Sequence, residues 1–401
     1  MVIFYFLYIF LEDNTQRGNI LIMIYYLFDT YTENNNDIIR KIRKSVISEA
    51  GTLRSRYILK CINKKIIIIS VAVPKAKGFF KEKKIVIDKR TQVIYLKALN
   101  IIGLRMFFSF FFLLDFLIRK IKNKDKIIIY NNDPKFIFAL LILKKMKKFY
   151  CTLQIEEMYS SYNFKHLKGY IYNLAEKYGI KFSDSYIICN SSIIKYLPKD
   201  KKYIINRGYK TWENPNYKNF AKNIKKIPII LYSGRLDYEG GVEVFLDSLV
   251  YIEKECEVII TGSGQLVEKV KNYKNYNKYI KYNYLGFIES EKYKELLIQA
   301  KICINPTRGK MPFLENSFPS KIYQYLEYGN IVISSNFLEI NNLDSLKKYI
   351  YTYNDDSPLE MAKLINKLID KNYNKSTIAI EFKNYFYNQE ISLKRFFTEM
   401  L

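Results

Sequence analysis

The chain has very little histidine and cysteine, and these shortages exclude several kinds of chemistry. Its 401 residues include one histidine, His166, which excludes a histidine-rich metal site or a histidine-based catalytic triad. The five cysteines lie far apart, with no C-x-x-C pair, and most of them lie in apolar, strand-like runs. We therefore interpret them as reduced core residues of a cytosolic protein, and expect neither a disulfide framework nor a metal site.

No apolar run is long enough to cross a membrane. The opening run, Met1 to Leu11, is too short and lacks the basic start and cleavage site of a signal peptide. The most apolar stretch, Met106–Ile118, is short, contains Asp115 and is framed by Arg105 and by Arg119 with Lys120. Two interpretations of it remain open. It is either a buried core helix or a helix at a membrane interface beside basic anchors.

Acidic residues are scarce relative to basic ones. The chain has 65 Lys and Arg against 39 Asp and Glu, which gives a formal net charge of +26. A/T-rich coding would account for part of this excess, because Ile, Lys, Asn and Tyr are all abundant. The charge nevertheless favours polyanions, anionic lipid and phosphorylated substrates as partners. With 49% hydrophobic residues, the composition is that of an ordinary globular protein.

Apolar runs typical of strands alternate with helical patterns in two successive series, which predicts two α/β domains of the Rossmann-like, doubly wound type facing a central cleft. Many of the runs are continuous Ile, Val and Tyr, as in parallel strands covered on both faces. We predict an N-terminal domain over 1–207, a C-terminal domain over 208–384, and a C-terminal helix over 385–401 that packs back towards the N-terminal domain. The break falls in the polar stretch 206–223.

Four glycine-bearing motifs in the second series lie where a strand ends or a helix begins. Each alone has an ordinary structural explanation, such as a tight turn, a capped helix or a solvated arginine. Gly234 and Arg235 follow one strand, and a forked cation there suits phosphate oxygens. The start of the later helix, with a nearby lysine, suits a diphosphate. The motifs are Ser233–Gly241, Thr261–Gly264, Leu285–Ile288 and Asn316–Gly329.

The order and spacing of these motifs resemble the donor-binding half of the family 4 glycosyltransferases, which have the GT-B fold. The resemblance is good over 227–335 and only topological over the N-terminal half. It implies that Arg235 and Lys321 bind the donor diphosphate without a metal, since no Asp-x-Asp sequence occurs. It further implies a donor site that contains Gly234, Gly262, Gly264, Phe287, Ile288, Asn316, Ser317, Phe318, Pro319, Ser320 and Gln324.

The chain departs from that family's pattern at three positions. Gly240 stands where a lysine usually follows the arginine by five residues. Asn316 and Gln324, eight positions apart, stand where many members carry glutamates for the donor sugar and the ribose. An amide can accept from a hydroxyl and also donate, so we take both as functional equivalents, although they lack the charge-strengthened bond. A shifted register would restore one acid at most, from Glu315 or Glu327.

The N-terminal half is expected to bind the acceptor. Its candidates follow two strands: Asn132 and Asp133 after one, and Glu156 and Glu157 after the other. An acidic pair that emerges from an apolar strand is costly to bury, which favours a cleft position, although a solvated helix start would explain it equally well. His166 is a further candidate in a polar, aromatic loop, although such a position favours an ordinary surface histidine. Gly51, Thr52 and Arg54 are expected to form a loop near the diphosphate.

These observations predict a retaining, metal-independent sugar transferase with Arg235, Lys321, Asn316 and Glu157 as catalytic residues and no cofactor. The donor would be a nucleotide-sugar. The acceptor would be a glycan or a lipid-linked sugar in cell-surface polysaccharide synthesis, met in the cytoplasm or peripherally at the inner, anionic face of the membrane. Two alternatives remain: a catalytically weak or inactive scaffold or binding protein of the same fold, or a basic nucleic-acid-binding protein. Against the latter, no nucleic-acid module is recognised, and specific nucleic-acid binding is not expected.

Overall fold

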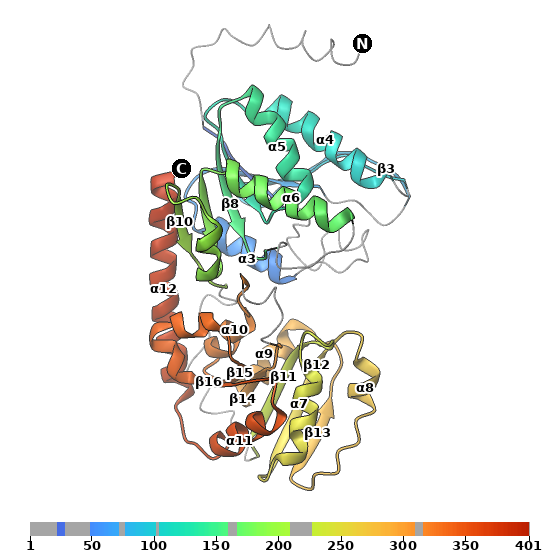
Figure 1. Ribbon diagram of the computed structural model, residues 1–401, viewed down its shortest axis with the longest axis vertical. Helices are drawn as coiled ribbons and strands as arrows, with labels where there is room; N and C mark the ends of the chain where they lie inside the picture. The colour runs from blue at the N-terminus through green and yellow to red at the C-terminus, as the bar shows by residue number, and fades with distance from the viewer. Residues whose placement is uncertain are drawn as a thin grey trace.

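The computed structural model describes residues 22–28, 49–71, 77–101, 104–158, 167–208, 227–308 and 316–400. These residues form two α/β domains, one above the other in Figure 1, with the long helix α12 (Lys375–Met400) along one side of both. The prediction of two Rossmann-like, doubly wound domains is confirmed by the two separate sheets.

The N-terminal domain is built on an eight-stranded sheet in the order β10-β9-β8-β7-β1-β2-β5-β4. All its neighbouring strands are parallel except β4, which runs antiparallel to β5 at one edge. The central strands are buried Ile and Tyr runs because helices cover both of their faces. The strands are β1 (Ile24–Leu27), β2 (Ile66–Ser70), β4 (Lys83–Val86), β5 (Thr91–Tyr95), β7 (Lys126–Tyr130), β8 (Tyr150–Ile155), β9 (Ser185–Ile188) and β10 (Lys202–Ile205), and a separate hairpin pairs β3 (Gly78–Phe80) with β6 (Ala98–Asn100).

Helices on the two faces of this sheet form two different cores. Helix α3 (Glu49–Lys60) packs on the face that carries Tyr26 and Ile128, whereas α4 (Arg105–Lys120), α5 (Pro134–Met146) and α6 (Leu167–Phe182) pack on the face that carries Leu27 and Ile129. The prediction of a loop at Gly51, Thr52 and Arg54 is wrong, because all three residues lie inside α3. Their local sequence is a poor helix signal, and it is burial against the sheet that stabilises the helix.

The C-terminal domain has a six-stranded, all-parallel sheet in the order β13-β12-β11-β14-β15-β16. Numbered along the chain, this is the 3-2-1-4-5-6 order of a dinucleotide-binding domain, with its switch point between β11 and β14. The elements are β11 (Ile229–Arg235), α7 (Val242–Ser248), β12 (Cys256–Ser263), α8 (Val267–Lys271), β13 (Ile280–Tyr284), α9 (Ser290–Gln299), β14 (Ala300–Asn305), α10 (Lys321–Glu327), β15 (Ile331–Ser335), β16 (Ile350–Tyr353) and α11 (Pro358–Leu368), with short 3₁₀ turns at Leu249–Tyr251, Leu338–Asn342 and Asp344–Tyr349. A further 3₁₀ turn, Ser191–Tyr196, lies between β9 and β10 of the N-terminal domain.

Helix α12 links the two domains. It is continuous from Lys375, which lies ten residues before the segment 385–401 that the sequence suggested as a separate helix. Near its start Phe382 packs against Tyr323 of α10, and further along Phe386 packs against Tyr57 of α3. At its end the carbonyl of Met400 accepts from Lys126 Nζ of the N-terminal sheet, at 3.0 Å.

Two sequence expectations concern buried or apolar segments. All five cysteines are buried and unpaired, and burial raises the pKa of Cys61, Cys151 and Cys256 to about 12, which leaves them as unreactive thiols.

Within the described ranges, no helix is long and apolar enough to cross a bilayer. Helix α4 combines features of both interpretations of Met106–Ile118, since Leu113, Phe116 and Leu117 are core residues while its first turns are exposed.

Candidate active site

Three predicted residues converge where the two domains face each other. Arg235 ends β11 at the switch point of the C-terminal sheet, and Lys321 is the first residue of α10. Glu157 follows β8 of the N-terminal sheet. Ligands of open parallel sheets bind beyond the carboxyl ends of the strands, so these positions suit a shared site.

Arg235 is a cation that can exchange its partners. Its side chain is 67% exposed and forms ion pairs with Glu239 at 2.8 Å and Asp237 at 3.3 Å, within its own loop. Exposed pairs of this kind contribute little to stability. A phosphate group, with its fixed oxygen geometry, can therefore compete for the guanidinium.

Lys321 lies behind Arg235 in a more enclosed position. Its Nζ donates to the carbonyl of Ser233 and lies 3.4 Å from Ser233 Oγ. A Cβ on Gly234 would come within 2.9 Å of this Nζ, so a glycine there leaves room for the amine. Burial, and then the nearby Arg235, lower the pKa of Lys321 to about 7. The amine is thus poised to gain a proton when an anion arrives.

Glu157 couples the N-terminal domain to this cationic pair. Glu157 is exposed at the surface, but desolvation by the surrounding protein and then the neighbouring Glu156 raise its pKa, while the positive charge of Arg235 opposes that rise. Arg235 therefore acts electrostatically on Lys321 in its own domain and on Glu157 in the other. A carboxylate and two cations from the two domains make up one electrostatic cluster.

Packing explains the glycines of this region. A Cβ on Gly262 would lie 1.8 Å from the carbonyl oxygen of Gly234, its partner across the two strands, and one on Gly264 would lie 2.4 Å from that of Leu236. Gly240, where the family pattern has a lysine, is equally enclosed, since a Cβ would lie 2.3 Å from the carbonyl oxygen of Arg235. The backbone of this loop leaves no room for a lysine at 240.

The two amides that replace the expected glutamates are both engaged. Asn316 is buried, and its Oδ1 accepts from Ser192 of the N-terminal domain at 2.8 Å. Gln324 accepts from Tyr293 of α9 at 3.4 Å. Asn190 also donates to the carbonyl of Ser317 at 2.8 Å, so the segment before α10 is docked on the N-terminal domain.

The remaining donor-side residues differ in their packing. Phe318 packs edge-on against Tyr323, with 4.8 Å between the ring centroids, and the carbonyls of Pro319 and Ser320 accept the first bonds of α10. Phe287 follows the turn at Gly286 and is largely exposed, whereas Ile288 packs on the core. Of the possible substitute acids, Glu327 is buried and Glu315 lies outside the described residues.

The acceptor candidates separate into different roles. Asp133 caps α5, accepting from the backbone of Lys135 at 3.0 Å, and it also pairs with the Lys135 ammonium. Asn132 is fully buried against Gly179, and within the described part of the chain its side-chain amide has no hydrogen-bond partner. Neither of them joins the cluster around Arg235. His166 lies outside the described residues.

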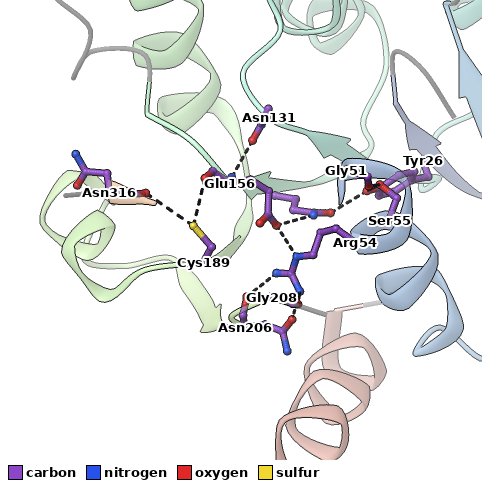
Figure 2. Close-up of polar contacts among 11 residues, drawn as sticks. Tyr26, Gly51, Arg54, Ser55, Asn131, Glu156, Cys189, Asn206, Gly208 and Asn316 are labelled. Atoms are coloured by element: carbon purple, nitrogen blue, oxygen red, sulfur yellow. Dashed lines mark hydrogen bonds and ion pairs between the residues drawn. The ribbon is translucent and has the colours of Figure 1, made fainter. Parts of the chain in front are cut away.

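Glu156 belongs to a buried network that the sequence did not reveal (Figure 2). Its Oε1 accepts from Arg54 Nε of α3 at 2.8 Å and from Gln154 at 2.7 Å. The same guanidinium donates to Asn206 and to the carbonyl of Gly208, in the segment that leaves the N-terminal domain. Arg54 therefore links Glu156, the neighbour of Glu157, to the segment that connects the two domains.

The described ranges contain no group of three His, Cys, Asp or Glu side chains that could hold a metal ion. The polar groups of the site are instead cations, carboxylates and amides. Such a set can bind a doubly charged anion and hydrogen-bond sugar hydroxyls.

Comparison with solved structures identifies the fold. Sucrose-phosphate synthase from Thermosynechococcus elongatus superposes with a TM-score of 0.68 at 12% identity, covering 94% of this chain and 99% of that one. The Anabaena protein HepE, solved with UDP-glucose, gives a TM-score of 0.60 at 13% identity, with coverage of 94% and 99%. WaaG, a glycosyltransferase involved in lipopolysaccharide biosynthesis, gives 0.56 at 10% identity, with coverage of 94% and 100%. The fold is GT-B.

At the sequence level, residues 227–371 match the model of the family described as "Glycosyl transferases group 1". The match covers the C-terminal GT-B domain and includes Arg235, Lys321 and the glycine motifs. No curated protein matches the chain.

Proposed function

We propose that the chain is a retaining glycosyltransferase of family 4. It would transfer a sugar from a nucleotide-sugar to a glycan or lipid-linked acceptor in cell-surface polysaccharide synthesis. The observation that carries the proposal is the cluster of Arg235, Lys321 and Glu157 between two Rossmann-like domains. The family match over 227–371 supports it, and so does the likeness to a protein solved with UDP-glucose.

The chemistry asks the protein to stabilise negative charge. As the bond between the anomeric carbon and the diphosphate breaks, charge develops on the leaving oxygen, and Arg235 with protonated Lys321 would stabilise it without a metal. The acceptor hydroxyl attacks the anomeric carbon from the face of the sugar that the diphosphate leaves, and it gives its proton to the departing diphosphate. The anomeric configuration is therefore retained. Hydrogen bonds that align the donor sugar and the acceptor hydroxyl would supply the rest of the rate enhancement.

The other residues would orient the two substrates. Glu157, on the acceptor side, would accept a hydrogen bond from a sugar hydroxyl. Asn316 would bind a donor hydroxyl once its amide leaves Ser192, and Gln324 would bind the ribose. The backbone around Gly262, Gly264, Phe287 and Ile288 would enclose the ribose and base, and the segment Ser317–Ser320 would line the diphosphate.

One alternative is favoured by specific contacts. Asn316 already bonds to Ser192, and position 240 has no room for a lysine side chain in place of Gly240. Both observations fit a protein of the same fold that binds nucleotide-sugars with little or no turnover. Binding and turnover must therefore be measured separately.

The decisive experiment is thermal unfolding with a panel of UDP, GDP and CMP and their sugars. One nucleotide at 100 times its Kd is expected to stabilise the folded chain by about 2.7 kcal/mol. The Arg235→Ala variant should lose this shift and at least about 10²-fold in transfer rate. Arg395→Ala, which removes an exposed arginine of α12, should keep both.

Each other outcome has a meaning. Nucleotide binding without transfer or hydrolysis would support the binding protein. Salt-sensitive nucleic-acid binding without any nucleotide effect would support the nucleic-acid alternative. Unchanged activity in Arg235→Ala would show that the donor site lies elsewhere.

A further inference from the structure

The N-terminal domain exposes a group of large apolar side chains at one end, which we call the α4 patch. It combines the first turns of α4 with the neighbouring β3–β6 hairpin. Met106 is 62% exposed, Phe107 57% and Phe79 57%. In Figure 1, α4 and β3 lie on the side of the upper domain opposite α12. The patch consists of Phe79, Ile101, Leu104, Met106, Phe107 and Phe111.

The patch is not required by the core of the domain. Ser109, Leu113, Phe116 and Leu117 form the buried face of α4. Phe107 and Phe111 lie one turn apart on its exposed face, with 4.5 Å between ring centroids. A surface helix of a soluble domain normally has polar residues on this face. Phe79 of the hairpin packs near Phe112 of the same helix, with 6.5 Å between ring centroids, and large apolar side chains gathered in this way on a surface mark an interaction site.

The charges around the patch are predominantly positive. From Lys77 to Lys120 the chain carries ten basic and three acidic residues. Lys77 and Lys81 flank β3, and Arg105 begins α4. The acid on α4, Asp115, is paired with Arg119 at 2.6 Å and lies 3.5 Å from the ammonium of Lys97.

From these features we propose that the α4 patch binds the surface of a lipid bilayer that contains anionic lipids. Aromatic and long apolar side chains would enter the headgroup region, while the flanking cations contact lipid phosphates. A protein partner would need acidic side chains placed opposite each of these cations. An anionic bilayer carries negative charge over its whole surface and needs no such match. The proposal is independent of the donor site, since it uses no residue of the cleft.

The test is cosedimentation of the full chain with vesicles of phosphatidylcholine, alone or with 30% phosphatidylglycerol. We expect binding to the anionic vesicles that weakens as salt increases. The double variant Phe107→Ser, Phe111→Ser should lower the partition coefficient at least tenfold. Removing charge with Lys77→Gln and Arg105→Gln should lower it about fivefold for each cation on anionic vesicles only.

Matched controls separate the patch from the overall charge. Val250→Ser with Tyr276→Ser removes exposed apolar side chains from the C-terminal domain, and Lys274→Gln with Lys278→Gln removes two exposed cations there. Both controls should bind like the parent chain. All variants should keep the nucleotide-dependent thermal shift, so a failure of this proposal is distinct from a failure of the proposed function.

Three results would overturn the proposal. One is the absence of binding to anionic vesicles. Another is equal loss of binding in the patch variants and the controls, which would show that net charge alone is responsible. The last is a patch variant that converts a dimer to a monomer in light scattering while vesicle binding stays unchanged, which would identify the patch as a contact between copies of the chain.

Discussion

Lys321 shows how one residue can link substrate charge to a proton. Its amine is enclosed beside Ser233 and Arg235, and its pKa of about 7 leaves it only partly protonated near neutral pH. A diphosphate bound there would favour the charged form and raise that pKa.

At pH 8, above its pKa of about 7, Lys321 is mostly neutral when no ligand is bound, and this allows a prediction about proton uptake. Binding of the matching nucleoside diphosphate should take up close to one proton, and its affinity should fall as pH rises from 7 to 9. Calorimetry in two buffers of different ionisation enthalpy measures this uptake directly. Lys321→Met should bind more weakly and take up no proton. An equal uptake by the parent and by this variant would assign the proton to another group.

Gly240 provides a second test at the same scale. Gly240→Lys would restore the family's lysine in sequence, but its Cβ would collide with the carbonyl of Arg235. We therefore expect a loss of about 2 kcal/mol or more in unfolding free energy, measured by urea denaturation, and no gain in transfer. Gly286→Ala is the control, because a Cβ there meets no atom within 4 Å and the cost comes only from its positive φ of 68°. A stable, more active Gly240→Lys variant would contradict the described loop.

Sequence reasoning named candidate residues that follow strand ends but did not predict which distant residues pair with one another. Arg235 and Lys321 were predictable because glycine-bearing strand ends and a helix start have local signals. Arg54 and Glu156 are 102 residues apart, and the ion pair of Arg207 with Glu339 joins residues 132 apart. No local pattern encodes such pairs, since they depend on the packing of whole elements.

At the scale of elements, the sequence predicted what burial dictates most strongly. Continuous apolar runs such as that of β7 are the pattern from which the parallel sheets were predicted. Several edge and hairpin strands were missed because they are only three to five residues long, as in β3 with its sequence GFF and β4 with its sequence KKIV. The start of α12 illustrates the other difficulty. Asn374 caps it locally, its Oδ1 accepting from the backbone of Ser376 at 2.9 Å, but its first residue also makes a tertiary contact that no local pattern shows.

That contact is the buried ammonium of Lys375 at the carboxyl end of α9. Its Nζ donates to the carbonyls of Ile298 and Ala300 and to Asn330 Oδ1, each at 2.7 Å. Carbonyls at a helix carboxyl end attract a cation, although burial lowers the pKa of Lys375 to about 7.

We predict that Lys375→Met lowers the unfolding free energy by about 1–3 kcal/mol, because it leaves buried acceptors without a donor. Replacing an exposed lysine of the same helix, in Lys383→Met, should change it by less than about 0.5 kcal/mol. In the parent chain, folded Lys375 binds fewer protons than unfolded Lys375 between pH 7 and 10.5. Its contribution to stability should therefore rise with pH in that window and be absent from the variant. A flat difference between parent and variant across that window would mean that the amine stays fully charged.

At the scale of the whole molecule, buried arginines hold the connection between the domains from both sides. Asn206 and Gly208 bond to Arg54 of the N-terminal domain. Between them, Arg207 pairs with Glu339 of the C-terminal domain, and Glu339 also accepts from Ser191 Oγ at 2.6 Å.

Glu339→Ala should cost about 3–5 kcal/mol, because it leaves the Arg207 charge buried and unpaired. The exposed interdomain pair of Lys202 with Glu399, at 3.3 Å, gives the comparison, and Glu399→Ala should cost no more than about 1 kcal/mol. Chemical denaturation followed by circular dichroism measures both. Similar, small effects of the two changes would show that the buried pair does not couple the domains.

Helix α12 also limits how the molecule can open. The polypeptide passes between the domains near residue 208 and returns along α12, whose two ends are fixed to different sheets. Once the hydrogen bonds from Asn190, Ser191 and Ser192 to the C-terminal domain break, two bodies that the chain joins at two separated points keep only the rotation about the line through those points. Admitting a donor and releasing a product would then be a single swinging motion about that line, and twisting or sliding of one domain across the other would require α12 to bend or detach.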